Sequence, residues 1–168
     1  MRTHGRVTVT GVGNEFRRDD GVAWAVLARL RERSRQRPLP PGTEPATCDG
    51  DPGRLSALWE GTHLAVVVDP AHAHPGTPGR GHRLGLGAGA LARSAAPSSH
   101  GPGLGAAVEL ARVPDPLPER RVGCAVEGAG SALGTGLSPA VADAVAPLAE
   151  AAEAEIAPDR DTSGGRPT

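Results

Sequence analysis

The sequence predicts an α/β fold: a three-layer sandwich with a twisted, mostly parallel sheet of about five strands between helices. Two observations support this fold class. Apolar or β-branched runs alternate along the chain with segments of helical periodicity, which is the order typical of parallel sheets covered by helices. One run, residues 63–69, is apolar nearly throughout, as expected of a parallel strand that is buried on both faces.

Five elements are expected in the first half of the chain. They are a strand at 6–12, a helix at 20–35, a weaker strand at 44–48, a short helix at 51–59 and a strand at 63–69. The first helix carries apolar residues at a spacing near 3.6 and is ended by prolines. The short helix opens with Asp51 and Pro52, a favourable start because proline suits the first helical position.

Four further elements are expected in the second half. They are a strand around 84–86, a helix at 103–112, a strand at 121–126 and a helix at 138–156. Ser138 and Pro139 are a good start signal for the last helix. We expect residues 1–157 to form one domain, and residues 158–168 to form a flexible polar tail.

The composition narrows the class of protein. Aromatic residues make up only 2% of the chain, so Val, Leu and Ala have to fill the interior. The formal net charge of -1 and the lack of a basic stripe argue against a nucleic-acid partner. No apolar run has the length of a signal peptide core or a membrane span, which predicts a cytoplasmic protein with no membrane partner. We also expect a monomer. Cys48 and Cys124 lack CxxC spacing, so we expect buried free thiols, with a disulfide between them as the alternative.

Three polar residues stand at predicted strand ends or in the following loops: Asp20, Asp69 and His100. Two carboxylates and an imidazole suit a divalent transition metal such as nickel, zinc or copper. Each has a simpler interpretation. Asp20 caps the first helix, Asp69 stabilises a turn before Pro70, and His100 is an ordinary loop histidine.

Other polar residues are given a structural interpretation. His72 and His74 have a spacing that occurs in metal sites, but their Gly- and Pro-rich surroundings favour solvated loop histidines. We expect Asp19 to face solvent or the helix end. Arg17 and Arg18 could attract an acidic chain end, although most loop arginines are only solvated.

The glycine turn after the first strand also raises the alternative of a nucleotide-binding domain. Gly11 and Gly13 follow a strand and precede a helix, but Phe16 occupies the place of the third glycine in GxGxxG. The acidic pair at the helix entrance would also repel a pyrophosphate. No GxSxG element of a serine hydrolase is present.

Five motifs together resemble those of the hydrogenase maturation proteases, the endopeptidases that process the large subunit of nickel-iron hydrogenases. The motifs are residues 11–14 (GVGN) with 19–21 (DDG), 49–50 (DG), 66–69 (VVVD) with 78–79 (PG), 99–100 (SH) with 103–104 (GL), and 136–141 (GLSPAV). They span nearly the whole chain. Pro70 stands where the family commonly has alanine, and Asp20 where some members have glutamate.

The resemblance implies a function and a set of site residues. Members cleave a C-terminal peptide from the large-subunit precursor after nickel insertion, by an aspartic-type or metal-assisted mechanism. By position, the catalytic and metal-contacting residues fall on Asp20, Asp69 and His100. The nickel would be carried by the substrate, the nickel-iron hydrogenase large-subunit precursor, and would not be a resident cofactor. The alternative is a non-cleaving binding module or chaperone for the metallated subunit.

Overall fold

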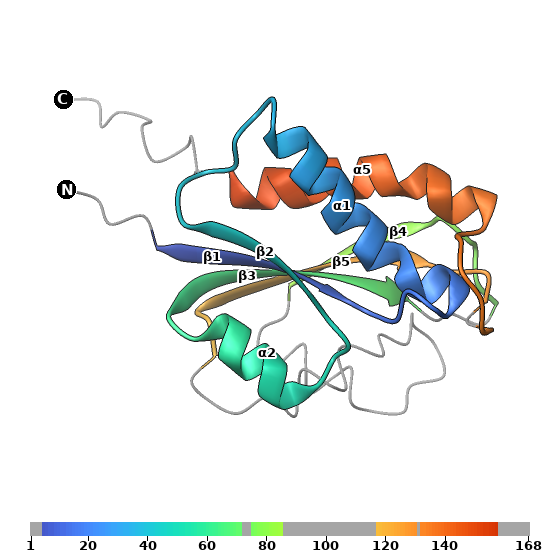
Figure 1. Cartoon of the computed structure of the whole chain (residues 1–168), viewed down its shortest axis with the longest axis horizontal. Helices are drawn as coiled ribbons and strands as arrows, with labels where there is room; N and C mark the ends of the chain where they lie inside the picture. Colours follow the sequence, from blue (N-terminus) through green and yellow to red (C-terminus); the bar gives the residue numbers. More distant parts are fainter. Residues whose placement is uncertain (1–4, 72–74, 86–116, 131, 158–168) are drawn as a thin grey trace.

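The computed structural model describes residues 5–71, 75–85, 117–130 and 132–157. These residues form a five-stranded sheet in the order β2-β1-β3-β5-β4, with helices α1 and α5 on one face and α2 on the other (Figure 1). The strands are β1 (Arg6–Val12), β2 (Thr43–Cys48), β3 (Thr62–Ala71), β4 (Gly81–Gly85) and β5 (Arg120–Glu127). The helices are α1 (Val22–Ser34), α2 (Pro52–Trp59) and α5 (Pro139–Ile156), with a short 3-10 helix η1 (Arg18–Gly21) before α1. The predicted fold class is confirmed.

The strand pairing brings the carboxyl ends of four strands to one edge of the sheet. β1 pairs in parallel with β2 and β3, and β3 pairs in parallel with β5. β4 is antiparallel to β5 and ends the strand order. Pro45 is tolerated in β2 because that strand lies at the opposite end of the order, where one side needs no ladder hydrogen bond. In open α/β sheets, the edge with the carboxyl ends is where ligands bind.

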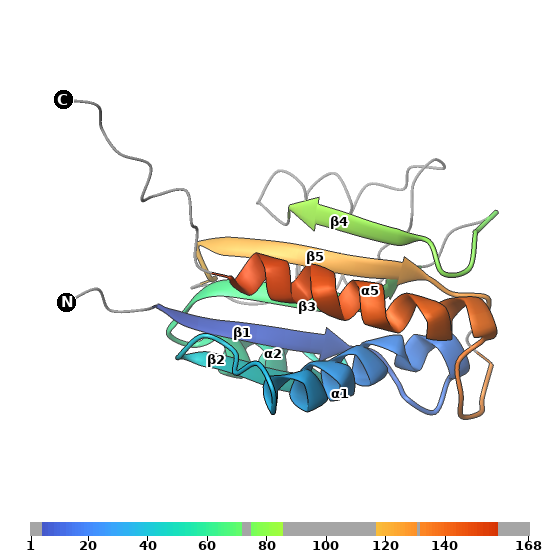
Figure 2. The same cartoon turned by 90° about the horizontal axis from the view of Figure 1, so that it is seen from above.

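Two apolar clusters hold the layers together. The larger cluster lies between the sheet and helices α1 and α5, which run side by side over it (Figure 2). It is built from valines, leucines and alanines, as the composition predicts. The smaller cluster packs Leu55 and Trp59 of α2 against the other face, where the Trp59 indole donates to Thr10 Oγ1 at 3.2 Å. Arg33 of α1 joins α5 through two hydrogen bonds to Glu153, at 2.7 and 3.0 Å.

Several predictions of local structure are confirmed and two need correction. Cys48 and Cys124 are buried free thiols. α5 begins at Pro139 as predicted, and α2 begins after Asp51, whose side chain accepts from the Arg54 amide at 3.0 Å. The strand expected to end at residue 69 runs on to 71, and the helix expected to begin at 20 begins at 22. None of the described helices is long and apolar enough to cross a membrane.

Candidate functional site

The segments that carry Asp20 and Asp69 meet at Gly13. β1 has just ended, and Gly13 adopts a φ of 149°, a conformation that favours glycine. A side chain here would collide with the backbone carbonyl of Asp20, and its Cβ would lie 3.6 Å from Pro70 Cδ. The Trp24 indole also donates to the Gly13 carbonyl at 3.0 Å. The backbone of Asp20 and the residue after Asp69 therefore pack around one glycine at the carboxyl edge of the sheet.

Asp20 is half-buried in η1, and its carboxylate holds the preceding turn. Its Oδ2 accepts from the Asn14 amide at 3.2 Å. The residue at the N-cap of α1 is Gly21, which has no side chain, so the helix-capping interpretation of Asp20 is wrong for that helix. Asp20 is instead part of the loop between β1 and α1, beside the strand ends.

Asp69 is buried inside β3, with a relative exposure of 6%. The strand continues through Pro70 and Ala71, so the interpretation of Asp69 as a turn residue is wrong. Its register partner is Ala125 of β5, and it shares a sheet face with Ala65 and Val67, the face that α2 covers. Asp69 is thus held by regular strand pairing close to the carboxyl edge.

The prediction that Asp19 faces solvent or the helix end is wrong. It is only 3% exposed. Its carboxylate accepts from the Ala129 amide and the Ser138 amide, each at 2.7 Å, and from Ser138 Oγ at 2.8 Å. Burial acts to raise the pKa of Asp19, but the hydrogen bonds from Ser138 and Ala129 outweigh it and bring the pKa below its ordinary value. Asp19 is a structural anchor for the segment before α5.

Backbone hydrogen bonds join the same two segments. The Arg18 amide donates to the Gly134 carbonyl at 2.9 Å, and the Gly134 amide donates to the Phe16 carbonyl at 2.8 Å. Among the described residues, Arg18 is the one non-glycine residue with a positive φ, 50°. We call residues 13–21, 128–130 and 132–138 the paired loops. Their pairing gives the loop that carries Asp20 a second attachment, independent of β1 and α1.

A third buried carboxylate, Glu127, lies at the same edge and was not identified from the sequence. It ends β5 at 4% exposure, and its Oε2 lies 2.8 Å from His82 Nε2. The hydrogen bond with His82, followed by one from the Thr77 amide, holds the pKa of Glu127 below its ordinary value. His82 and Asp69 both align with Ala125, so this pair shares the face of Asp69. The signal in the sequence was an acidic residue directly after an apolar strand, as at Asp69.

The predicted metal-contacting set is only partly described. His100 lies outside the described residues, as do His72, His74 and the helix expected at 103–112. Within residues 5–71, 75–85, 117–130 and 132–157, no three His, Cys, Asp or Glu side chains are arranged to hold a metal ion. The convergence of Asp20, Asp69 and His100 on one metal therefore stays a prediction.

The two thiols are not activated nucleophiles. Burial raises the pKa of Cys124 to about 11, and burial is also the main cause that raises the pKa of Cys48. A thiol of this kind is protonated at neutral pH, and the thiolate is the reactive form.

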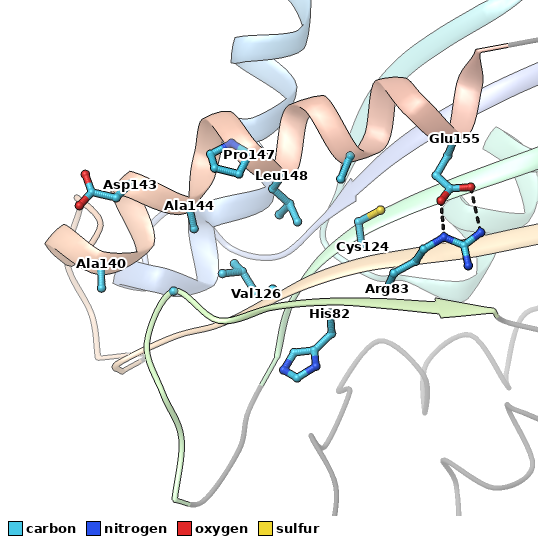
Figure 3. Close-up of a pocket in the computed structure, with 13 residues that line it drawn as sticks. His82, Arg83, Cys124, Val126, Ala140, Asp143, Ala144, Pro147, Leu148 and Glu155 are labelled. Atoms are coloured by element: carbon cyan, nitrogen blue, oxygen red, sulfur yellow. Dashed lines mark hydrogen bonds and ion pairs between the residues drawn. The ribbon is translucent and has the colours of Figure 1, made fainter.

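A large groove elsewhere on the molecule is separate from these carboxylates. It has a volume of about 460 Å³ and lies between β4, β5 and α5, with Cys124 and Val126 along its floor. Figure 3 shows Arg83 bonded to Glu155 at one end of the groove, and His82 pointing away from α5. Because Cys124 and Val126 alternate with Ala125, the groove is on the sheet face opposite Asp69.

The comparisons with known proteins concern the fold. No family model matches the sequence, and no curated protein matches it. Among solved structures, the hydrogenase maturating endopeptidase HybD of Escherichia coli superposes with a TM-score of 0.69 and 22% identity, covering 95% of this chain and 94% of that one. The [NiFe] hydrogenase maturation protease HybD of Thermococcus kodakarensis gives 0.64 and 18%, covering 90% and 99%.

A third solved structure shows the same likeness. The hydrogenase 2 maturation peptidase of a Thaumarchaeota archaeon gives a TM-score of 0.64 and 21% identity, covering 90% of this chain and 98% of that one. All three superpositions extend over at least nine tenths of both chains, so the likeness is not confined to a common sheet motif. The resemblance found in the sequence is thereby confirmed at the level of the fold: the chain has the fold of the hydrogenase maturation endopeptidases.

Proposed function

We propose that the chain is an endopeptidase that removes a C-terminal peptide from the precursor of a nickel-iron hydrogenase large subunit after nickel insertion. The observation that carries this proposal is the likeness to maturation endopeptidases over nearly the full length of both chains. The motif residues of the sequence support it, because Gly13, Asp20 and the segment at Asp69 and Pro70 pack together at the carboxyl edge of the sheet.

Asp20, Asp69 and His100 would contact the nickel that the substrate carries. Imidazole and carboxylate groups suit this metal. Asp69 would be a rigid contact because it belongs to a paired strand, and Asp20 would be a more adjustable one because it belongs to a loop. With the metal delivered by the substrate, cleavage would depend on metal loading: without nickel the three side chains have no shared partner.

The chemical step requires a water molecule to attack the carbonyl carbon of the scissile peptide bond. The substrate's metal would polarise that carbonyl or lower the pKa of the attacking water. A carboxylate that is not consumed as a metal contact would accept the proton of the water. The peptide nitrogen then leaves with a proton, and the products are a carboxylate and an amine.

The deciding experiment compares nickel-loaded and nickel-free precursor of one large subunit, each incubated with the purified full chain. Intact-mass spectrometry is expected to show loss of a C-terminal peptide from the nickel-loaded form alone. A stable complex in which the precursor keeps its mass would contradict cleavage and support the alternative, a non-cleaving binding module or chaperone. Asp69→Asn tests the proposed role of that residue, with exposed Asp143→Asn on α5 as the matched control.

A further inference from the structure

A second groove opens beside the loop that carries Asp20. It has a volume of about 470 Å³ and lies between residues 15–18, the outer side of α1 and residues 135–137. On α1 its floor is made by Ala25 and Ala28, whose small side chains leave the hollow. Phe16, Trp24 and Leu137 form its apolar walls. We call this the α1 groove.

The wall at Phe16 is unusually exposed for a large apolar side chain. Phe16 is 61% exposed, and the other large apolar side chain with high exposure in the described residues is Leu133, at 74%. Both belong to the paired loops, in which the Gly134 amide donates a hydrogen bond to the Phe16 carbonyl. Phe16 lines the α1 groove with Trp24 and Leu137, whereas Leu133 is not among its lining residues. Scattered exposed apolar residues are ordinary, but a large exposed apolar side chain beside a groove with apolar walls is typical of a surface that binds a partner.

The charges at the α1 groove favour a partner with carboxylates. Arg18 and Arg31 line it, and Glu15 is the acidic residue among its lining side chains. Exposed Arg17 adds a further positive charge next to it. Among the described residues, neither Arg18 nor Arg31 forms an ion pair, so no acidic side chain of the described fold neutralises them. Arginine binds carboxylates well because its planar fork donates two parallel hydrogen bonds.

The α1 groove is continuous with the candidate site. The Trp24 indole that walls it donates to the carbonyl of Gly13, the residue around which Asp20 and Pro70 pack. Gly21, the neighbour of Asp20, lines the groove itself. A polypeptide segment lying in the groove would therefore reach the carboxyl edge of the sheet.

We propose that the α1 groove docks an extended segment of the protein substrate, with an apolar side chain against Phe16 and Trp24 and a carboxylate facing Arg18 and Arg31. This rests on the proposed function, because it takes the hydrogenase precursor as the partner. The groove is a binding surface and not part of the chemistry, so its loss acts on substrate affinity.

The test uses Phe16→Ser and Arg31→Glu in the full chain, with Arg18 left intact because its guanidinium packs against Gly134. Arg37→Glu, an exposed position beyond the end of α1, is the matched charge control. The probe is fluorescently labelled, nickel-loaded large-subunit precursor, with binding followed by anisotropy. Each test variant is expected to weaken binding about tenfold, the effect of one good interface contact, and Arg37→Glu to leave it unchanged.

Cleavage kinetics on the same precursor supply the second readout. The two test variants are expected to raise KM about tenfold with little change in kcat, and Arg31→Lys is expected to restore most of the affinity because it restores the charge. Unchanged binding in both test variants overturns the docking proposal, as does a fall in kcat at unchanged affinity, or a wild-type chain that does not bind the precursor. Binding that weakens as expected, without any cleavage by the wild type, supports docking and overturns the endopeptidase function alone.

Discussion

Asp19 and Asp20 are consecutive residues that belong to two different regions of the molecule. Asp19 faces the paired loops, is 3% exposed and accepts hydrogen bonds from Ala129 and Ser138. Asp20 lies at the carboxyl edge of the sheet, half-buried, and accepts from Asn14. The oxygens of Asp19 are occupied by donors from a distant segment, as expected of a carboxylate that holds the architecture together. Under the proposed function, Asp20 instead has to stay within reach of the substrate's metal, so the two neighbours would have different uses despite their equal charge.

The largest effect is expected for Asp20→Asn on cleavage. The amide keeps the shape of the side chain but loses the charge, so cleavage of a nickel-loaded precursor should fall about 100-fold or more. The free energy of unfolding should change by less than about 1 kcal/mol, because the hydrogen bond from the Asn14 amide is exposed and asparagine keeps an acceptor oxygen for it. Mass spectrometry and urea unfolding on the same preparation measure both. Full cleavage activity in this variant would remove the distinction between the two residues.

Asp19→Ala should act in the opposite way, on stability. It leaves the amides of Ala129 and Ser138 without their acceptor in a partly buried setting, at a cost of about 2 kcal/mol. Urea unfolding monitored by circular dichroism measures the loss. Asp19→Asn, which keeps one acceptor oxygen, should lose less than Asp19→Ala. Equal stability of Asp19→Ala and wild type would show that the paired loops do not depend on this carboxylate.

The pH dependence of stability sharpens the same contrast. The pKa of Asp19 is lowered in the folded protein, so its contribution is complete above the ordinary aspartate pKa and is lost as the pH falls through the folded value. Melting temperatures between pH 7 and pH 2 should therefore fall at the acid end for wild type. The melting temperature of Asp19→Asn should fall less steeply toward acid pH, because this variant lacks the carboxylate whose protonation destabilises the wild type. Parallel curves for the two proteins would contradict this assignment.

The smallest effect is expected at the thiols. Because burial raises the pKa of Cys124 to about 11, native protein should react with iodoacetamide far more slowly than protein in urea. Alkylation followed by intact-mass measurement checks this, and Cys124→Ser should cleave the precursor within about twofold of wild type. Rapid native labelling with loss of cleavage would place a cysteine in the mechanism and weaken the case for the strand-end carboxylates.

The Glu127 region adds a second form of structural carboxylate. Its partners among the described residues include the His82 imidazole and the Thr77 amide, and Arg80 Nε lies 4.0 Å from its Oε2, so side chains as well as backbone hold this carboxylate. Asp19 has amide and hydroxyl donors only, none of which titrates in the range where the protein is folded. Both carboxylates secure segments at the carboxyl edge of the sheet: Asp19 holds the segment before α5, and Glu127 holds the segment that leads into β4.

Local sequence patterns were sufficient for most of the architecture. The apolar run at 63–69 predicts β3, and the cap and proline residues Asp51, Pro52, Ser138 and Pro139 predict the starts of α2 and α5. Such signals are local because strand burial and helix starts depend on neighbouring residues. The order of strands then brings the segments of Asp20 and Asp69 to the same edge, as expected of parallel strands.

The sequence by itself determined the fold class, the order of the described strands and helices, and the presence of acidic residues near the ends of the first and third strands. Only the tertiary structure decided which of those residues is an anchor. The donors that bury Asp19 lie 110 and 119 residues further along the chain, and the histidine paired with Glu127 lies 45 residues before it. Hydrogen bonds over such separations leave no periodicity or spacing in the sequence, because they form only after the strands and helices have packed.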